Sequence, residues 1–338
     1  MATDRILITG STGFVGRHVV QALLEQDFPI TLTVRNAHAI PPAWRQNSKI
    51  DIIDGIDLAS PTSAETALEL AFTNVRTVVH LAGLAHIAAG DKANPGDQFM
   101  QANSEATRRL VEVARTRAVG SFIHLSSLAA ITANATEATI DDRTVFPAET
   151  PYGRSKLAAE QHLHLLSDAG IFAVSLRPPL IVGAEARGNW ALLQRLAITG
   201  LPLPLASVAT RRSFVSIRSV AEAIVTLCSS NWPSNLSGAY CLADPESLSL
   251  PEVLTALRKG MGLSPGLIPF PPAVFAVVGA LTGRRRQFAG LTGALEVDAS
   301  RFYATFAFAP TLPLKEAIRQ SGTMYSEMRK ARRLTSSG

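Results

Sequence analysis

The feature that most constrains this chain is a glycine-rich turn between a short apolar run and an amphipathic pattern near the N-terminus. Residues 5–9 read as a buried strand, and apolar residues at helical spacing begin at Val15. Gly10, Gly13 and Gly16 stand between and just inside these two patterns. In a βα unit they would permit the tight turn, let the backbone approach a pyrophosphate, and let helix and strand pack closely. The pattern predicts a dinucleotide site; a glycine-rich turn without a ligand is the alternative.

Strand-like runs alternate with helical patterns up to about residue 180. This alternation predicts right-handed βαβ crossovers and an α/β fold with a parallel, doubly wound sheet of the Rossmann type. In such sheets, ligands bind at the carboxyl ends of the strands. The runs are 5–9, 30–34, 49–53, 77–82, 120–126 and 172–177.

After residue 178 the pattern is less regular and richer in proline and glycine, which predicts a smaller C-terminal α/β substrate domain. We expect a dinucleotide-binding domain at 1–178, to which segments near 210–240 return, and a substrate-binding domain at 179–325. Residues 213–217 and 239–242 read as strands, and residues 220–228 read as a helix. Residues 326–338 are expected to form a loose basic tail.

Tyr152 and Lys156 place a phenol and an ammonium four residues apart, on one face of a predicted helix. A phenol with a pKa of about 10 is a weak acid at neutral pH. An ammonium roughly 4 Å away would lower the pKa of Tyr152 by about three, toward about 7, less the effect of desolvation. The pair therefore predicts a proton donor and acceptor for hydride-transfer chemistry at an alcohol or ketone.

Bulk composition excludes several classes of protein. The chain has 338 residues, of which 47% are hydrophobic and 17% are charged, as in globular proteins. The start lacks the basic flank and apolar run of a signal peptide. Two cysteines, Cys228 and Cys241, provide neither a disulfide framework nor metal-ligand spacing, so we expect no metal and a cytoplasmic location.

The formal net charge is +5, and part of it lies in two arginine-rich runs, 284–286 and 329–333. No nucleic-acid recognition motif accompanies them, so a nucleic-acid partner is not expected. The apolar run 271–281 is too short to cross a bilayer, and a buried helix is favoured over a membrane anchor. The basic runs read either as solvated faces or as holders of the phosphates of an anionic substrate.

With these features, the chain resembles the extended branch of the short-chain dehydrogenase/reductase superfamily, in the NAD-dependent epimerase/dehydratase group. Residues 78–83, 122–127 and 176–183 match the fourth, fifth and sixth strands of that family in order. The resemblance implies a catalytic Ser127 with Tyr152 and Lys156. Ser126 is the adjacent alternative, and a strand-end cap is the non-catalytic interpretation of both serines.

The resemblance also implies a set of cofactor-binding residues. Arg35 ends the second strand, where enzymes that prefer NAD carry a carboxylate, so NADP (NADPH) is favoured and NAD remains possible; an exposed arginine with no ligand is the alternative. The expected set is Gly10, Thr12, Gly13, Phe14, Val15, Gly16, Arg35, Asp57, Leu58, Leu81, Ala82, Gly83, Asn103, Tyr152, Lys156 and Pro178.

A nucleotide-sugar substrate, linked to UDP, follows from the same resemblance. Leu295 matches a position that leaves room for an N-acetyl group at the sugar C2. Residues 284–286 are candidates for a second phosphate-binding arginine. The expected substrate-binding residues are His86, Ser127, Asn189, Leu203, Arg212 and Leu295.

Three functions remain after this comparison of motifs. The first is NADPH-dependent reduction of the 4-keto group of a UDP-linked 6-deoxy-N-acetylhexosamine for surface polysaccharide. The second is a UDP-hexose or UDP-N-acetylhexosamine 4-epimerase, and the third is a non-catalytic dinucleotide-binding sensor. A dehydratase is disfavoured because residues 128–129 are Leu-Ala rather than an acidic pair. Relatives often form homodimers, which here would use residues 99–115 and 151–167.

Overall fold

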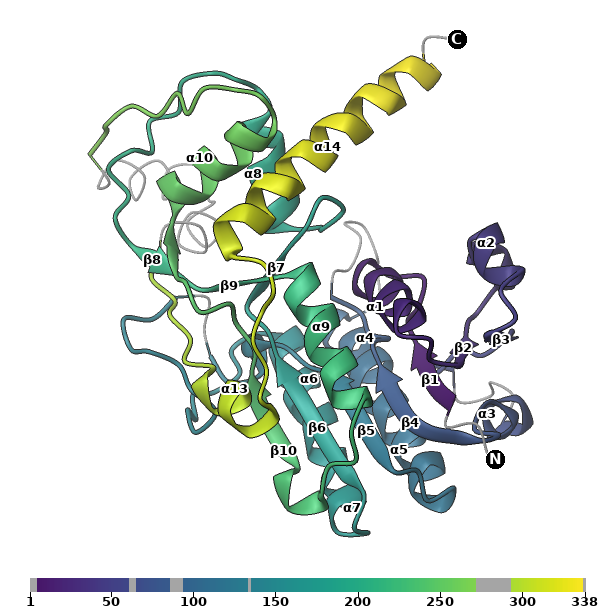
Figure 1. Ribbon diagram of the computed structural model, residues 1–338. Coiled ribbons are helices and arrows are strands. Elements are labelled where there is room, and N and C mark those ends of the chain that lie inside the picture. The colour runs from purple at the N-terminus through teal and green to yellow at the C-terminus, as the bar shows by residue number, and fades with distance from the viewer. Residues whose placement is uncertain (1–4, 61–64, 86–93, 133–134, 272–292, 337–338) are drawn as a thin grey trace.

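A seven-stranded parallel sheet forms the centre of the computed structural model, which describes residues 5–60, 65–85, 94–132, 135–271 and 293–336 (Figure 1). The spatial order is β10-β6-β5-β4-β1-β2-β3, with parallel register between all neighbours. This order confirms the predicted doubly wound parallel sheet. The strands are β1 (Arg5–Thr9), β2 (Ile30–Thr33), β3 (Ile50–Ile53), β4 (Val75–His80), β5 (Ser121–Leu125), β6 (Phe172–Arg177) and β10 (Gly238–Cys241).

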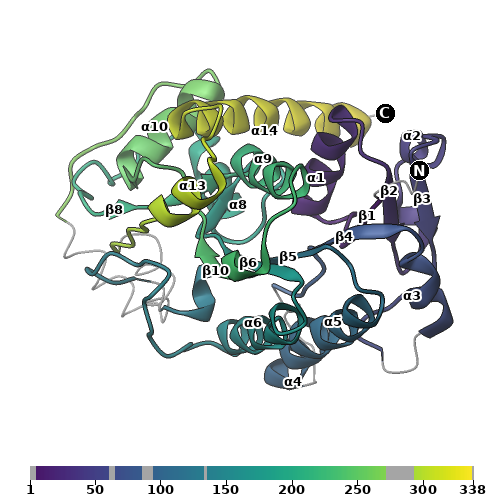
Figure 2. The same ribbon diagram turned by 60° about the horizontal axis from the view of Figure 1, so that its bottom comes forward.

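Helices cover both faces of this sheet, because successive side chains of a strand point to opposite sides. Ile6 and Ile8 of β1 pack toward α1 (Phe14–Glu25) and α9 (Ile217–Cys228), and Leu7 packs toward α5 (Ala106–Thr116). Figure 2 shows α1 and α9 on one face and α5 and α6 on the other. The remaining helices of this part are α2 (Pro42–Arg45), α3 (Glu65–Ala71), α4 (Pro95–Phe99), a π-helix (Met100–Glu105), α6 (Pro151–His162) and α7 (His164–Ser167).

Residues after β6 build a second, smaller lobe and also return to the sheet. β7 (Leu180–Val182) pairs with β9 (Phe214–Ser216), and β8 (Arg211–Arg212) pairs with β11 (Leu248–Ser249). The core of the lobe includes Trp190, Leu254 and Ile318, all buried. Its helices are α8 (Asn189–Ala197), α10 (Leu250–Gly260) and α14 (Leu314–Ser336), while α13 (Ser300–Phe306) packs its phenylalanines near β10.

The C-terminal residues correct one prediction. Residues 326–338 were expected to be a loose basic tail, but α14 is one continuous helix from Leu314 to Ser336. Its first half crosses α10 so closely that a Cβ at Gly260 would lie 1.9 Å from the carbonyl oxygen of Arg319. Figure 1 shows its second half projecting beyond the lobe. Tertiary packing of the first half therefore sets the direction of a segment that looks featureless in the sequence.

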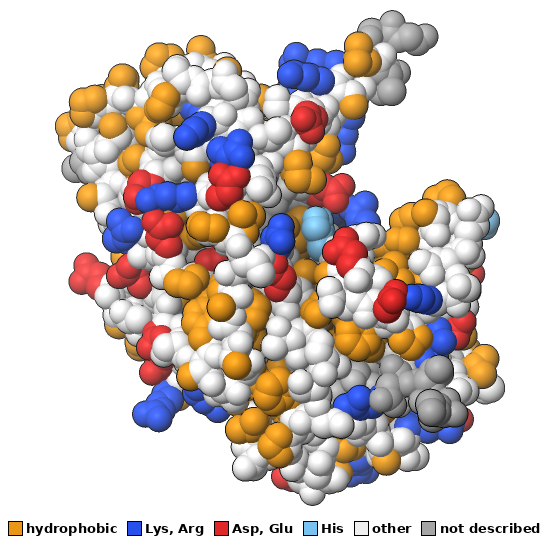
Figure 3. Space-filling model, in the orientation of Figure 1, with side chains coloured by type: hydrophobic (Ala, Val, Ile, Leu, Met, Phe, Trp, Pro, Cys, Tyr) orange, Lys and Arg blue, Asp and Glu red, His pale blue; other side chains and the backbone are white. Residues whose placement is uncertain are grey.

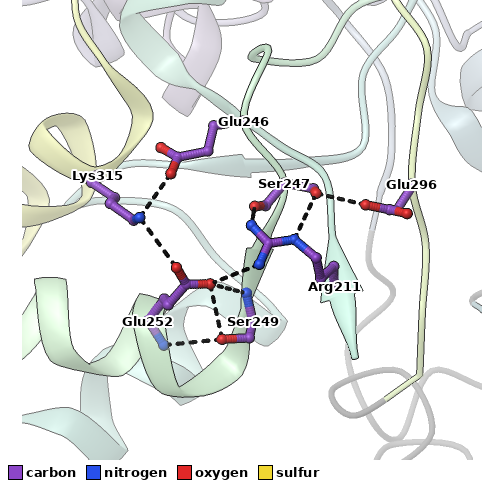
Figure 4. A network of polar contacts seen from close by, with 7 residues as sticks. All are labelled: Arg211, Glu246, Ser247, Ser249, Glu252, Glu296 and Lys315. Atoms are coloured by element: carbon purple, nitrogen blue, oxygen red, sulfur yellow. Dashed lines mark hydrogen bonds and ion pairs between the residues drawn. The ribbon is translucent and has the colours of Figure 1, made fainter. Parts of the chain in front are cut away.

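A polar network ties the start of α14 to α10 and to the small sheet (Figure 4). Lys315 Nζ lies 2.8 Å from Glu246 Oε1 and 3.1 Å from Glu252 Oε1. Glu252 also forms a capping box with Ser249 at the beginning of α10. The backbone amide of Ser249, aided by Lys315, lowers the pKa of Glu252 to about 2. These contacts join the beginning of α14 to the beginning of α10.

Among the described helices, none has both the length and the apolar character that a bilayer crossing requires. The apolar run 271–281 that raised this question lies almost entirely outside the described residues.

Candidate active site

The glycine turn lies at the carboxyl end of β1, an interior strand between β4 and β2. Gly10 has φ +71°, and a Cβ there would lie 2.5 Å from the amide nitrogen of Ala82, which follows β4. A Cβ at Gly16 would lie 2.1 Å from the carbonyl oxygen of Gly10, so helix α1 packs directly on the turn. Gly13 caps α1 without a side chain. The first amides of a helix have no intrahelical acceptor, so this end of α1 is suited to an anion.

Tyr152 and Ser127 come from neighbouring elements that pack closely together. Tyr152 is in the first turn of α6, which Thr150 caps by accepting a 2.9 Å hydrogen bond from Gly153 N. A Cβ at Gly153 would lie 2.1 Å from the carbonyl oxygen of Ala129, so this turn lies against the segment that follows Ser127. The Ser127 hydroxyl lies near enough to the Tyr152 phenol to favour its ionised form. Glycine at 153 therefore makes this contact possible.

The electrostatics of the tyrosine differ from the prediction. Loss of hydration raises the pKa of Tyr152, and the nearby Ser127 hydroxyl only partly offsets this effect. Lys156 Nζ donates a 2.8 Å hydrogen bond to the carbonyl oxygen of Leu125, and its side chain is buried. Burial lowers the pKa of Lys156 to about 8, against an opposing effect of Glu160. The expected lowering of the tyrosine pKa toward 7 is wrong for this state, because loss of hydration disfavours the phenolate more than its neighbours favour it.

A buried ion pair that sequence reasoning missed supports these groups. Arg177 at the end of β6 contacts Glu160 of α6 through hydrogen bonds of 2.6, 3.0 and 3.2 Å. Ser126 Oγ also donates to Glu160. The Ser126 hydroxyl is thus used in a buried hydrogen bond, while Ser127 lines the cavity together with Tyr152. No local sequence pattern links positions 160 and 177; the packing of α6 beside the end of β6 brings them together.

Asn103 has a positioning role in this structure. Its amide nitrogen donates to the carbonyl oxygen of Leu84 (3.0 Å) and to Ser155 Oγ (2.9 Å), and its Oδ1 accepts from Leu84 N (2.7 Å). The side chain is buried and lies outside the cavity lining. It joins the loop after β4 to α6, and a Cβ at Gly83 in that loop would lie 3.0 Å from Asn103 Oδ1.

A single cavity of about 1290 Å³ joins the glycine turn to the tyrosine. Its size and its glycine cradle fit a dinucleotide together with a second ligand. Lys and Arg side chains lie along the projecting helix and at the base of the notch beside it (Figure 3). The predicted residues that line the cavity are Gly10, Thr12, Gly13, Phe14, Val15, Gly16, Leu81, Gly83, Ser127, Tyr152, Lys156 and Pro178.

Four other predicted cofactor residues lie outside this lining. Arg35 is exposed at the end of β2. Asp57 and Leu58 follow β3, and Leu58 is buried in the core beneath α5. Ala82 is half-buried, and its amide donates to Thr9 Oγ1 at 3.2 Å. Ala82 thus contacts the residue that precedes the glycine turn and does not line the cavity.

The predicted substrate residues are scattered more widely. Asn189 is exposed at the start of α8, and Leu203 is buried in the core of the second lobe. Arg212 and Leu295 do meet each other through a β-bridge, with Leu295 packed near Leu128. None of these four lines the cavity. His86 and residues 284–286 lie outside the described residues.

One wall of the cavity was anticipated only as an alternative, in which arginines of the run 329–333 hold the phosphates of a substrate. It is formed by Tyr325, Met328, Arg329, Arg332 and Arg333 of α14. Their spacing of three and four residues was the available signal, since it places side chains on one face of a helix. The prediction of a loose tail for residues 326–338 did not place this helix face at the cavity.

Comparison with known proteins agrees with this geometry. A family model described as "NAD dependent epimerase/dehydratase family" matches residues 6–236. The chain belongs to this family. It is 30% identical to a UDP-glucose 4-epimerase of Vibrio cholerae over 326 residues, which are 95% of each chain. It is 29% identical to a ceramide reductase of Caulobacter vibrioides (strain NA1000 / CB15N) over 83% of this chain and 79% of that protein.

Solved structures show the same fold. A UDP-glucuronic acid 4-epimerase from Bacillus cereus in complex with NAD superposes with a TM-score of 0.74 over 96% of each chain, at 18% identity. A Thermus thermophilus UDP-glucose 4-epimerase in complex with NAD gives 0.71 at 22% identity, over 95% of this chain and 98% of that one. The family model and the Vibrio cholerae relative together identify the chain as an enzyme of the NAD-dependent epimerase/dehydratase family.

Proposed function

We propose that this enzyme is a UDP-sugar 4-epimerase. The observation that carries the proposal is that the Tyr152 phenol and Ser127 line the same cavity as the glycine turn. Similarity to the Vibrio cholerae UDP-glucose 4-epimerase over nearly the whole chain supports this substrate class. The sequence motifs alone favour a ketoreductase, but similarity to this relative favours the epimerase.

The residues of the site suit reversible proton transfer at a sugar hydroxyl. Ser127 orients the oxygen on C4, and Tyr152 accepts its proton as the C4–H bond breaks. NAD, when bound, supplies a hydride acceptor and then a hydride donor. After the 4-ketone turns its other face, Tyr152 returns the proton to the same oxygen. The raised pKa of Tyr152 makes its phenolate a strong proton acceptor. The positive charge of the buried Lys156 favours the phenolate, which must be present before this transfer and is formed again when the proton returns to the sugar.

The Gly10–Gly16 turn and the beginning of α1 would hold the pyrophosphate of NAD. The turn cannot accept side chains at Gly10 or Gly16 without moving the backbone, so its shape is built for close approach.

A direct test is incubation of the protein with UDP-glucose or UDP-N-acetylglucosamine and NAD, with products separated by chromatography. An epimerase converts each sugar to its C4 epimer without net oxidation of the cofactor. Tyr152→Phe should abolish this conversion and leave NAD binding intact. No conversion of either UDP-sugar by the unmodified protein would refute the proposal.

A 4-ketoreductase acting on a UDP-linked 6-deoxy-N-acetylhexosamine is the second candidate, and Arg35 favours it. The guanidinium is exposed and has no hydrogen-bond or ion-pair partner in the described part of the chain, which suits the 2′-phosphate of NADPH. Stoichiometric loss of reduced-nicotinamide absorbance with the 4-keto sugar would identify this activity. Arg35→Asp should then weaken NADPH far more than NADH.

A further inference from the structure

One face of the C-terminal helix completes the cavity. Tyr325, Met328, Arg329, Arg332 and Arg333 of α14 line it, at the three- and four-residue spacing that aligns side chains on a helix. This stripe of five side chains begins with Tyr325 and Met328 and becomes basic toward the C-terminus. Lys330 belongs to the same basic run but is exposed and does not line the cavity.

The position of this stripe follows from packing in the first half of the helix. Leu314 and Ile318 are buried against the core of the second lobe. Ser321 Oγ accepts hydrogen bonds of 3.3 Å from both Trp190 Nε1 and Gln194 Nε2. These contacts fix how α14 is rotated about its own axis. The rotation turns the later arginines toward the cavity.

The other walls add positive charge and little negative charge. Arg17 lies in the first turns of α1, and Arg187 and Arg195 lie just before and within α8; all three line the cavity. Glu185 is the one carboxylate among the described lining residues, and it is already 3.2 Å from Arg17. Like charges gathered around one cavity repel each other, and a polyanion bound between them offsets this cost.

We infer that Arg329 and Arg332, with Arg195 of α8, bind a diphosphate of the nucleotide held in this cavity. Guanidinium groups match phosphate oxygens in charge and geometry. The dinucleotide is the nearer source, because Arg17 and Gly13 line the same cavity at the beginning of α1. The nucleotide sugar carries the same chemical group. The inference rests on the proposed function only in requiring that a nucleotide enters this cavity.

Binding measurements test the inference without turnover. NAD, NADP and UDP would each be titrated by calorimetry into the unmodified protein, the double variant Arg329→Gln/Arg332→Gln, and the control Lys330→Gln. Glutamine keeps the helix propensity of arginine, so the fold should survive. The double variant should bind the diphosphate source at least about tenfold more weakly, since hydrogen bonds to charged groups are each worth about a factor of ten. Lys330→Gln should change little.

The titrations with NAD, NADP and UDP distinguish a diphosphate of the cofactor from that of the substrate. Weaker NAD and NADP binding assigns the arginines to the cofactor, and weaker UDP binding assigns them to the substrate. Arg195→Gln gives a second reading from another helix, should the α14 variant lose its structure by circular dichroism. Unchanged affinities for all three nucleotides, or an equal loss in Lys330→Gln, would overturn the inference. Absent epimerisation with normal arginine-dependent binding would refute only the proposed function.

Discussion

Lys156→Met should stabilise the fold while abolishing turnover, because the buried ammonium is held at an energetic cost. Burial lowers the pKa of Lys156 from 10.5 to about 8. At about 1.4 kcal/mol per tenfold change in an acid constant, this corresponds to roughly 3 kcal/mol. The variant leaves the carbonyl oxygen of Leu125 without its 2.8 Å hydrogen bond, and this loss destabilises the variant by about 1 kcal/mol. We expect a net stabilisation of about 2 kcal/mol at pH 7.

The pH dependence of this difference follows from linkage. Below the folded pKa of about 8, both states are protonated and the full cost applies. Between 8 and the unfolded value of 10.5 the folded protein sheds the proton first, so the cost shrinks and is gone above 10.5. The stabilisation by methionine should therefore be present at pH 7 and lost near pH 10.5.

Urea unfolding of both proteins at pH 7 and at pH 10.5 provides the measurement, since other titrating groups cancel in the difference between them. Activity of Lys156→Met on the identified substrate gives the functional readout. A destabilised variant, or a free-energy difference that stays constant between these pH values, would refute the reasoning.

Three further outcomes are expected. Glu160→Gln should cost about 3–5 kcal/mol in urea unfolding, because it leaves a buried guanidinium unpaired, whereas the exposed Glu69→Gln should cost less than about 1 kcal/mol; equal losses would contradict this. Gly13→Ala should reduce NAD binding with little change in Tm, whereas Gly16→Ala should lower both; the opposite ranking would count against the cradle. Glu252→Gln should cost about 1 kcal/mol at pH 7 after allowance for solvent screening, a difference that fades as pH falls from 4.5 toward 2; a pH-independent cost would argue against the network.

Much of the sheet could be predicted because its signals are local. The runs 5–9 and 172–177 coincide with β1 and β6, and Gly10 takes the positive φ that its place in the turn predicts. The pairing of Ser127 with Tyr152 was accessible through family resemblance. The tyrosine pKa was predicted in the wrong direction, because spacing along a helix says nothing of how deeply two side chains are buried.

By itself, the sequence determined the alternation of strands and helices and the glycine turn, since each depends on neighbours within a few residues. Tertiary structure alone decided that Glu160 meets Arg177, that Ser126 turns inward, and that α14 becomes a wall of the cavity. The physical reason is that these contacts join positions far apart in the chain. Their geometry is set by how whole elements pack, and the buried side chains then acquire charges and partners that no local pattern specifies.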